Sequence, residues 1–354
     1  MNHLVSIVAK LPEYDLDAML ITSASSEFYA VGFHGEGTAL VTPERTWYYT
    51  DSRYIEAASQ QITGATVAMP ERNVGVRAVV RALVEQKGIQ KLGFEDEYMS
   101  VREYARWEEG MSAQLIPASR LVNELRMVKD EEELAAMREA QRVTDAAFAE
   151  ILGYIRPGMT EQEVAARLQY IMLRMGAERM SFDPIVAAGA NGSKPHAVPG
   201  PARIEQGQFV TMDFGCVCRG YCSDMTRTVA VGRLSPEMER VYHIVLEAQL
   251  AGIAAARAGV TGAQVHAAGA KVIGDAGYGD YFGHGFGHSL GIQVHEEPRF
   301  SPLWDKPIPA GAILSAEPGI YLPGRFGVRI EDVIILTQDG CVDITQSPKD
   351  LIIL

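Results

Sequence analysis

The segment 209–231, FVTMDFGCVCRGYCSDMTRTVAV, constrains the fold most, because it is strand-like throughout and still carries two carboxylates inside apolar runs. Its Val, Thr, Phe, Met and Tyr residues favour strands, and Gly220 permits a tight hairpin turn. A turn at 218–219 would put Asp213 and Asp224 directly opposite each other, with Cβ atoms only ~5 Å apart. Two buried carboxylates at that distance repel. The pair therefore requires one protonated acid, a neighbouring cation or a different register.

The length of the chain and a change of pattern along it predict two domains. A chain of 354 residues exceeds the usual size of one domain. Between about residues 16 and 120, short strands alternate with amphipathic helices, which indicates a mixed α/β domain. The expected strands are 17–22, 38–43, 45–50, 65–70, 91–96 and 113–118, and the expected helices are 52–61, 74–88 and 101–111. We place the domains at residues 1–122 and 123–354.

The second domain is expected to begin with long helices. A helical stretch covers 121–155 and could connect the domains. The next helix is expected to start after Thr160, with Glu163 completing a capping box. Strand-like segments with polar residues at defined places follow, together with helices over 235–259 and 261–277.

Charge and composition exclude several classes of function. The formal net charge is −13, from 45 acidic and 32 basic residues, so binding to nucleic acid or anionic lipid through bulk charge is not expected. No apolar run approaches the ~20 residues of a membrane helix, and the N-terminus lacks the pattern of a secretory signal, which makes a cytoplasmic location the expectation. The four cysteines are too few for a disulfide framework. Three of them cluster without a fourth metal ligand nearby, so we interpret them as small apolar strand residues: Cys216, Cys218 and Cys222.

Two glutamates also stand in apolar, strand-like surroundings. Glu317 follows an apolar run and precedes Pro-Gly, and Glu331 lies in VRIEDVIIL. In one continuous strand Arg329 and Glu331 would point to the same face. Each acid taken singly could instead form a simple ion pair between strands. Three acidic neighbours could compete for ligand roles: Glu296, Glu297 and Asp332, the last of which would face away from Glu331.

Three of the eight histidines fall within the glycine-rich stretch GHGFGHSLGIQVH, as His284, His288 and His295. Two histidines four residues apart on a helix could chelate a metal, but glycines at this density oppose a helix. We therefore expect a loop and a strand, in which glycine permits close approach to a neighbour. The isolated histidines are interpreted as loop, surface or packing residues: His34, His243 and His266.

The charge of the acidic residues favours a metal site over a protonated acid or a different strand register. Four carboxylates balance two divalent cations, and a neutral imidazole adds a ligand without changing that balance. A donor set dominated by oxygen suits Mn²⁺, Co²⁺, Fe²⁺ or Zn²⁺. Two such ions, bridged by carboxylates, lower the pKa of a bridging water and supply hydroxide at neutral pH.

The ordered residues Asp213, Asp224, His288, Glu317 and Glu331 resemble the metal-binding set of the pita-bread metallopeptidases (family M24), which include methionine aminopeptidase, aminopeptidase P and prolidase. The motifs that carry the resemblance are DFG…GYCSDMTRT, GHGFGH, VHEEP, AEPGIY and VRIEDV. The leading domain resembles that of the proline-specific and creatinase branch. The resemblance implies an α+β fold: a small creatinase-type α/β domain followed by a pita-bread catalytic domain with a curved, mainly antiparallel sheet.

The resemblance also implies a role for each matching position. Asp213 would chelate one ion, Asp224 and Glu331 would bridge both ions, and His288 and Glu317 would bind the other. Glu317 would in addition move the proton of the attacking hydroxide. Three histidines would contact the substrate or line its pocket: His196, His284 and His295. Arg329 matches the arginine beside the last glutamate and is counted with the catalytic residues. Thr226 would support Asp224 or serve as a plain strand residue.

The function that the resemblance implies is hydrolysis of an Xaa-Pro bond, at the N-terminus of a peptide or in a dipeptide. The resemblance also implies a homodimer and two divalent metal ions in the site, with Mn²⁺ as the first choice. The choice between dipeptides and longer peptides stays open. Alternatives are methionine-aminopeptidase-like cleavage, a metal-free creatinase-like hydrolase and a binding module without activity. Ser289 and Phe326 replace glycines that are usual in the family, which affects substrate preference more than activity.

Overall fold

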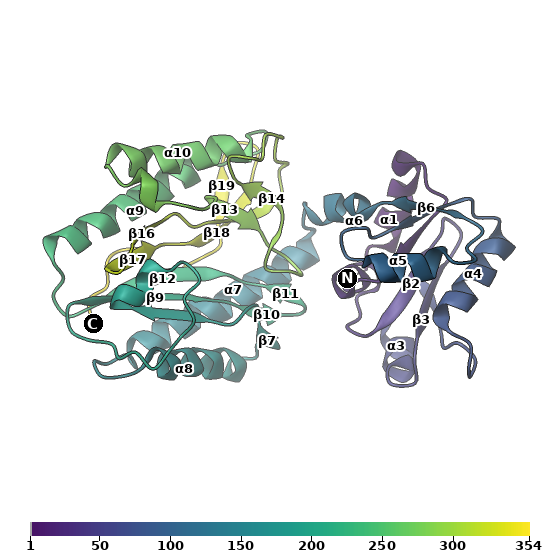
Figure 1. Ribbon diagram of the computed structural model, residues 1–354, viewed down its shortest axis with the longest axis horizontal. Helices are drawn as coiled ribbons and strands as arrows, with labels where there is room; N and C mark the ends of the chain where they lie inside the picture. The colour runs from purple at the N-terminus through teal and green to yellow at the C-terminus, as the bar shows by residue number, and fades with distance from the viewer. Residues whose placement is uncertain (1) are drawn as a thin grey trace. The chain divides into compact units, whose positions relative to one another are not determined.

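The computed structural model describes residues 2–354 and consists of two compact units, the first ending at Arg126 and the second comprising Met127–Leu354. Each unit has its own strands and covering helices (Figure 1). None of the helices that the structure describes combines the length and the apolar composition needed to cross a bilayer.

The first unit is a mixed six-stranded sheet flanked by helices, with the strand order β4-β3-β2-β1-β5-β6. The strands are β1 (Ala18–Ile21), β2 (Gly37–Val41), β3 (Thr46–Thr50), β4 (Ala65–Ala68), β5 (Lys91–Phe94) and β6 (Gln114–Pro117). The helices are α1 (Leu4–Lys10), α2 (Ala24–Val31), α3 (Ile55–Gln61), α4 (Val76–Lys87), α5 (Val101–Glu108) and α6 (Ser119–Arg126). All six predicted strands and all three predicted helices are present. Leu20 and Leu40 of the sheet pack against Val80 and Val84 of α4 and Trp107 of α5.

Two helices of the first unit, α1 and α2, were not expected from the sequence. Both are short, with seven and eight residues. Local signals nevertheless mark the ends of α2: the Ser23 side chain accepts a hydrogen bond from the Ser26 amide at 3.3 Å, and Gly32 ends the helix with φ 69°.

The prediction of one helix over 121–155 is wrong, because the chain forms α6 and then α7 (Glu131–Leu152). Between them Val128 forms an antiparallel bridge with Ala312, so its backbone pairs with a strand segment rather than continuing a helix. Asp130 then starts α7 with a capping box.

Besides α7, the second unit contains three further helices, two 3₁₀ turns and four small sheets in which every strand pair is antiparallel. The helical elements are α8 (Glu161–Arg174), α9 (Pro236–Ala255), α10 (Gly262–Asp275) and the 3₁₀ turns η2 (Gly189–Ser193) and η3 (Gly279–Tyr281). One group of strands is β7 (Arg179–Met180), β8 (Ile185–Ala188), β9 (Gln208–Phe214), β10 (Cys216–Cys218), β11 (Tyr221–Cys222) and β12 (Met225–Val231). The other is β13 (Gly287–Ser289), β14 (Glu296–Phe300), β15 (Ile313–Ala316), β16 (Gly319–Leu322), β17 (Phe326–Arg329), β18 (Asp332–Leu336) and β19 (Cys341–Asp343).

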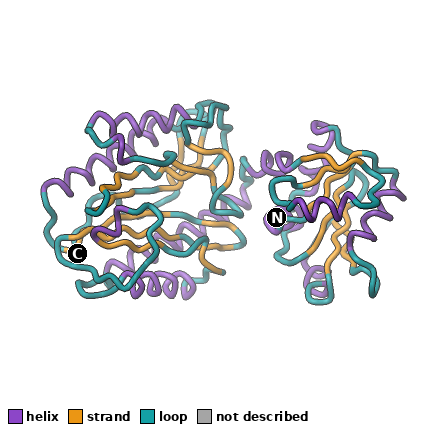
Figure 2. The backbone as a smooth tube through the Cα atoms, in the orientation of Figure 1, coloured by secondary structure: helices purple, strands orange, loops and turns teal. Residues whose placement is uncertain are grey.

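Helices cover the strands of the second unit on two sides (Figure 2). Phe148 of α7 and Leu168 of α8 pack against Met212 of β9, and Val245 of α9 packs within a separate cluster that includes Val328 of β17. The predicted helices over 160 onward, 235–259 and 261–277 are all present, and Thr160 and Glu163 form the expected capping box. The α+β architecture is confirmed.

The predicted register of the central hairpin is wrong by two residues. Asp213 pairs with Thr226, and the turn residues are Arg219 and Gly220, with φ values of 51° and 80°. A two-residue hairpin turn of this kind needs positive φ at both central positions, so Gly220 lies inside the turn rather than after it. Asp224 therefore lies diagonally from Asp213 instead of directly opposite.

Candidate metal centre and active site

All nine residues that the sequence singled out line one cavity of about 740 Å³ in the second unit. They are His196, Asp213, Asp224, His284, His288, His295, Glu317, Arg329 and Glu331. Residues 135 positions apart in the chain thus meet at one site, which no local structural role would require.

Strand ends bring the acids together. Only Asp213 lies within a strand, whereas Asp224 immediately precedes β12 and Glu317 immediately follows β15. The expectation that Arg329 and Glu331 share a strand is wrong, because the chain leaves β17 after Arg329 and joins a different sheet at Asp332. Both side chains still reach the cavity.

A glycine fixes the position of His288. A Cβ atom on Gly287 would lie 2.0 Å from the Ser315 carbonyl oxygen, so only glycine lets β13 approach β15 this closely. The close approach allows the His288 amide to donate to Ser315 Oγ at 3.0 Å, and Ser315 Oγ donates to Glu317 Oε1 at 3.1 Å. The neighbour that the sequence left unspecified is therefore strand β15.

His288 and Glu317 form a buried pair, with 3.2 Å between Nε2 and Oε1. Burial opposes the charge of each group, but the bond and the charge of the partner prevail. They lower the pKa of Glu317 to about 2 and raise the pKa of His288 above its usual value. Nδ1 of His288 lies 3.1 Å from the Ser289 carbonyl, which assigns a proton to Nδ1 and directs Nε2 into the site.

Arg329 organises one side of the cavity. It donates to Asp213 Oδ2 at 2.6 Å, to Thr226 Oγ1 at 2.9 Å and to the Tyr321 hydroxyl at 2.9 Å. Thr226 in turn donates to Glu331 Oε2 at 2.7 Å. Thr226 thus supports Glu331, whereas the sequence had suggested support of Asp224.

Three carboxylate oxygens remain buried without a hydrogen-bond partner in the part of the chain that the structure describes: Asp213 Oδ1, Asp224 Oδ1 and Glu331 Oε1. Burial, followed by repulsion from neighbouring carboxylates, raises the pKa of Asp224 and Glu331 well above the usual range. Burial also raises that of Asp213, although Arg329 opposes it. One guanidinium cannot neutralise four carboxylates, and an unpartnered buried carboxylate is costly. Ligand atoms of Asp224, His288 and Glu331 lie within 4.8 Å of one another, so the donor set fits a metal cation.

The other two histidines of the glycine-rich stretch differ in their surroundings. His284 Nδ1 lies 2.8 Å from the Gly285 carbonyl and Nε2 lies 3.0 Å from the Tyr321 hydroxyl, so both ring nitrogens are engaged. Burial lowers the pKa of His284. His295 is open to the cavity, and partial burial together with His288 lowers its pKa to about 4, which keeps it neutral near pH 7.

The sequence missed Tyr321, which joins His284 to Arg329 and lines the cavity. It stands in the motif AEPGIY, but a tyrosine in a strand is common and carries no signal of its own. Further lining residues that the sequence did not indicate include Phe182, Ile185 and Arg299.

The competing acids have other partners. As expected, Asp332 lies away from the cavity, where it accepts hydrogen bonds from Arg227 and Gln249, each at 2.7 Å. Glu296 is buried next to Lys129 at 3.3 Å, and Glu297 is exposed. The isolated histidines lie outside the cavity lining: His34 is exposed and stacks on Phe28, His243 is exposed on α9, and His266 stacks on Phe282.

Similarity to known proteins agrees with this geometry. Residues 135–338 match the model of metallopeptidase family M24, and residues 4–128 match the Creatinase/Prolidase N-terminal domain. The chain is a metallopeptidase in class. It belongs to family M24, as its sequence motifs indicated.

Similar proteins cover nearly the whole chain. An uncharacterized peptidase of Bacillus subtilis (strain 168), YqhT, is 42% identical over 96% of each chain. A Xaa-Pro dipeptidase of Pyrococcus horikoshii is 31% identical and covers 98% of this chain and 97% of its own. Among solved structures, a Xaa-Pro dipeptidase from Bacillus anthracis superposes with a TM-score of 0.95 at 42% identity, covering 99% of each chain.

Proposed function

We propose that this chain hydrolyses the Xaa-Pro bond of dipeptides, or of peptides with proline in the second position, with the help of two divalent cations. The observation that carries the proposal is the set of three buried, unpartnered carboxylate oxygens that face one cavity together with His288. The similarity to Xaa-Pro dipeptidases supports the choice of substrate.

The residues that would hold the cations are Asp213, Asp224, His288, Glu317 and Glu331. When bound, the cations would supply Lewis acidity toward the scissile carbonyl and an acidic water. This chemistry suits a bond to proline nitrogen, because a tertiary amide offers no N–H for a protease to bind.

The chain's own side chains would complete the reaction. Glu317 would accept a proton at Oε and pass it to the leaving nitrogen. His295, neutral near pH 7, would donate a hydrogen bond to the carbonyl oxygen as negative charge develops there. His196 would also hydrogen-bond the substrate, and Asp224 would in addition receive its free α-amine.

His284 would act as a wall of the proline pocket rather than as a proton donor. Its two ring nitrogens are already engaged by Gly285 and Tyr321. Arg329 would keep Asp213 and Tyr321 in place through its hydrogen bonds.

We further infer that manganese is the cation and that the protein is a homodimer, both from the family resemblance, and that it acts in the cytoplasm. Metal analysis of the purified protein, light scattering and cell fractionation test these three points in turn. The two domains are assigned to residues 1–122 and 123–354 from the change of pattern along the sequence.

The decisive test compares Ala-Pro, Ala-Pro-Ala and Met-Ala as substrates for metal-free protein with and without Mn²⁺. We expect Mn²⁺-dependent hydrolysis of one or both proline peptides and little hydrolysis of Met-Ala. Preference for Met-Ala would favour the methionine-aminopeptidase alternative. Equal hydrolysis without any divalent cation would favour a creatinase-like enzyme, and no hydrolysis of any peptide would favour a binding module.

A further inference from the structure

The buried carboxylate of Glu161, which does not line the cavity, joins the two ends of the loop 189–200, which does. Glu161, the first residue of α8, is fully buried. Its carboxylate accepts hydrogen bonds from the Ala188 amide at 2.7 Å and the Gly200 amide at 2.9 Å. Asn191 Nδ2 lies 3.0 Å from each carboxylate oxygen. One side chain thus ties the end of β8 to a position twelve residues later.

The loop between these two attachment points, residues 189–200, carries His196 to the cavity. Its middle is held at two more places. A Cβ atom on Gly327 would lie 2.1 Å from the Gly192 carbonyl oxygen, so the loop contacts β17 backbone to backbone. Arg329 Nη1 donates to the Pro195 carbonyl at 3.2 Å. The backbone is thus held on both sides of His196, which lines the cavity together with Pro195.

The contacts of Glu161 are not needed to start the helix. Thr160 and Glu163 already form the capping box of α8. The Asn191 amide is oriented for Glu161, because Lys194 Nζ donates to Asn191 Oδ1 at 2.9 Å and thereby turns the NH₂ group toward the carboxylate. All donors around Glu161 are neutral groups of the loop, and both carboxylate oxygens accept hydrogen bonds from them.

We propose that Glu161 is a positioning residue that fixes the loop 189–200 and thereby sets the place of His196 at the substrate. The inference rests on the proposed function, since it takes His196 to contact the peptide. None of the direct partners of Glu161 is a proposed metal ligand. The loop is connected to the ligand Asp213 through Arg329, which donates to both the Pro195 carbonyl and Asp213.

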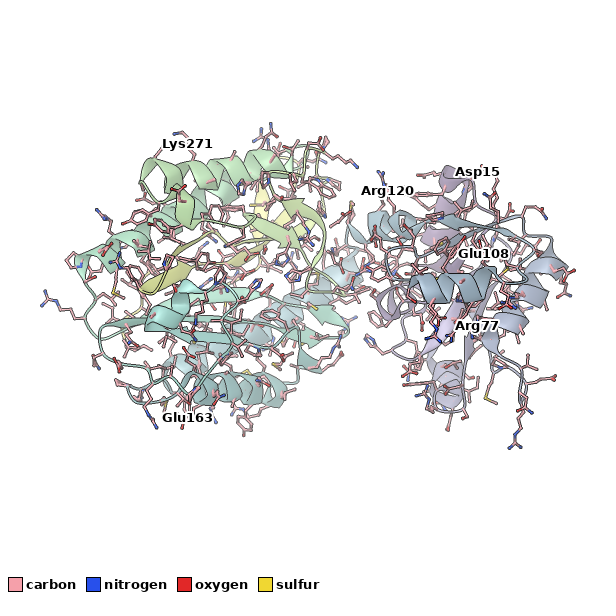
Figure 3. All side chains as sticks on the ribbon, in the orientation of Figure 1. Asp15, Arg77, Glu108, Arg120, Glu163 and Lys271 are labelled. Carbon is pink, nitrogen blue, oxygen red and sulfur yellow. The ribbon has the colours of Figure 1, made fainter. Side chains whose placement is uncertain are left out.

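The test variant is Glu161→Gln, which keeps the shape but turns one acceptor oxygen into a donor. We expect kcat/KM for Ala-Pro to fall about 10–100-fold, mainly through KM, as for other small displacements of binding groups. Mn²⁺ affinity measured by calorimetry should stay at the wild-type value. The matched control is Glu163→Ala in the same helical turn, on the outer side of α8 (Figure 3). It removes the Glu163 half of the capping box but none of the contacts to the loop, so it controls for a general loss of helix stability. This control should leave kcat/KM unchanged.

A double-mutant cycle separates positioning from a general loss of structure. In a His196→Ala background, Glu161→Gln should cause no further loss of kcat/KM, because its effect passes through His196. Independent, multiplicative losses would overturn the proposal. If Glu161→Gln does not fold, Asn191→Ala removes one partner of the carboxylate and should shift KM in the same direction by a smaller factor.

Hydrogen exchange keeps this inference distinct from the proposed function. Amides of the loop 189–200 should exchange faster in Glu161→Gln than in the wild type, and at the wild-type rate in Glu163→Ala. Unchanged loop exchange would overturn the positioning role even if the enzyme cleaves Ala-Pro. Failure of the wild type to cleave both Ala-Pro and Ala-Pro-Ala, with faster loop exchange in the variant, would instead overturn the proposed function alone.

Discussion

Replacing Asp224 by asparagine should stabilise the metal-free protein and at the same time abolish its response to metal. Asp224 is buried, its Oδ1 has no hydrogen-bond partner among the described residues, and burial and the charges of Glu331 and Asp213 raise its pKa. An acid whose pKa is raised on folding contributes stability below its unfolded pKa, and this contribution is lost as the pH rises toward its folded pKa. At pH 7 Asp224 therefore lowers the free energy of unfolding of the metal-free wild type.

The size of this destabilisation has an upper limit. Each pH unit between the ordinary pKa of 3.8 and pH 7 costs about 1.4 kcal/mol while the folded carboxyl keeps its proton, which gives a limit of about 4 kcal/mol. Asparagine is neutral and nearly isosteric, so the free energy of unfolding should rise by about 1–3 kcal/mol. For a unit of this size, that raises Tm by roughly 2–4 °C per kcal/mol.

The assay is thermal unfolding of EDTA-treated protein at pH 7, with and without Mn²⁺. Wild type should gain about 2.7 kcal/mol at a metal concentration one hundred times Kd, whereas Asp224→Asn should gain little. The contrasting variant is Asp332→Asn, in which loss of the bond to Arg227 should lower the free energy of unfolding by about 3–5 kcal/mol. A lower metal-free Tm for Asp224→Asn, together with a wild-type response to Mn²⁺, would refute the reasoning.

Three further predictions concern charge and packing. Burial raises the pKa of Glu27 to about 9, so stability should decline as the pH rises from 4.5 toward 9. Between pH 6 and pH 8, the free energy of unfolding measured in urea should fall by about 2–3 kcal/mol less in Glu27→Gln than in the wild type. Parallel plots of this free energy against pH for the two proteins would contradict the prediction. Binding of Mn²⁺ at pH 7 should release protons, because metal ligands must be deprotonated and the pKa values of Asp224 and its carboxylate neighbours are raised. Calorimetry in buffers of different ionisation enthalpy measures this release, and identical heats would speak against it. Gly287→Ala should lower the free energy of unfolding by about 1–3 kcal/mol, because the added Cβ would overlap the Ser315 carbonyl. In the control Gly283→Ala the added Cβ would have no other atom within 4 Å, so this variant should unfold at the wild-type temperature.

The sequence predicted the site better than it predicted the local geometry around it. Carboxylates such as Asp213 and Glu331 stand out in apolar strand-like stretches because burial makes a charge costly without a partner. The same cost favours a shared partner, so their convergence on one cavity could be predicted without knowing the sheet topology. The cap at Thr160 was equally visible, because its hydrogen bonds are local in sequence.

Features that depend on distant backbone could not be predicted in this way. The break before α7 arises from pairing of Val128 with Ala312, far along the chain. The partner of Gly287 is the carbonyl of Ser315, which no pattern near residue 287 reveals. The hairpin register depended on a single choice of turn type, and placing Gly220 after the turn rather than within it shifted the pairing by two residues. Tyr321 was missed because a buried tyrosine in a strand has many packing roles.

The central claim is that four carboxylates and one histidine of the second unit hold a pair of divalent cations. Anomalous diffraction at the manganese edge, from crystals of the full chain grown with Mn²⁺, measures this directly. Two peaks in the cavity, bounded by Asp213, Asp224, His288, Glu317 and Glu331, are the predicted result. A cavity without an anomalous peak, in which Asp213, Asp224 and Glu331 are satisfied by water and protons alone, would contradict the account.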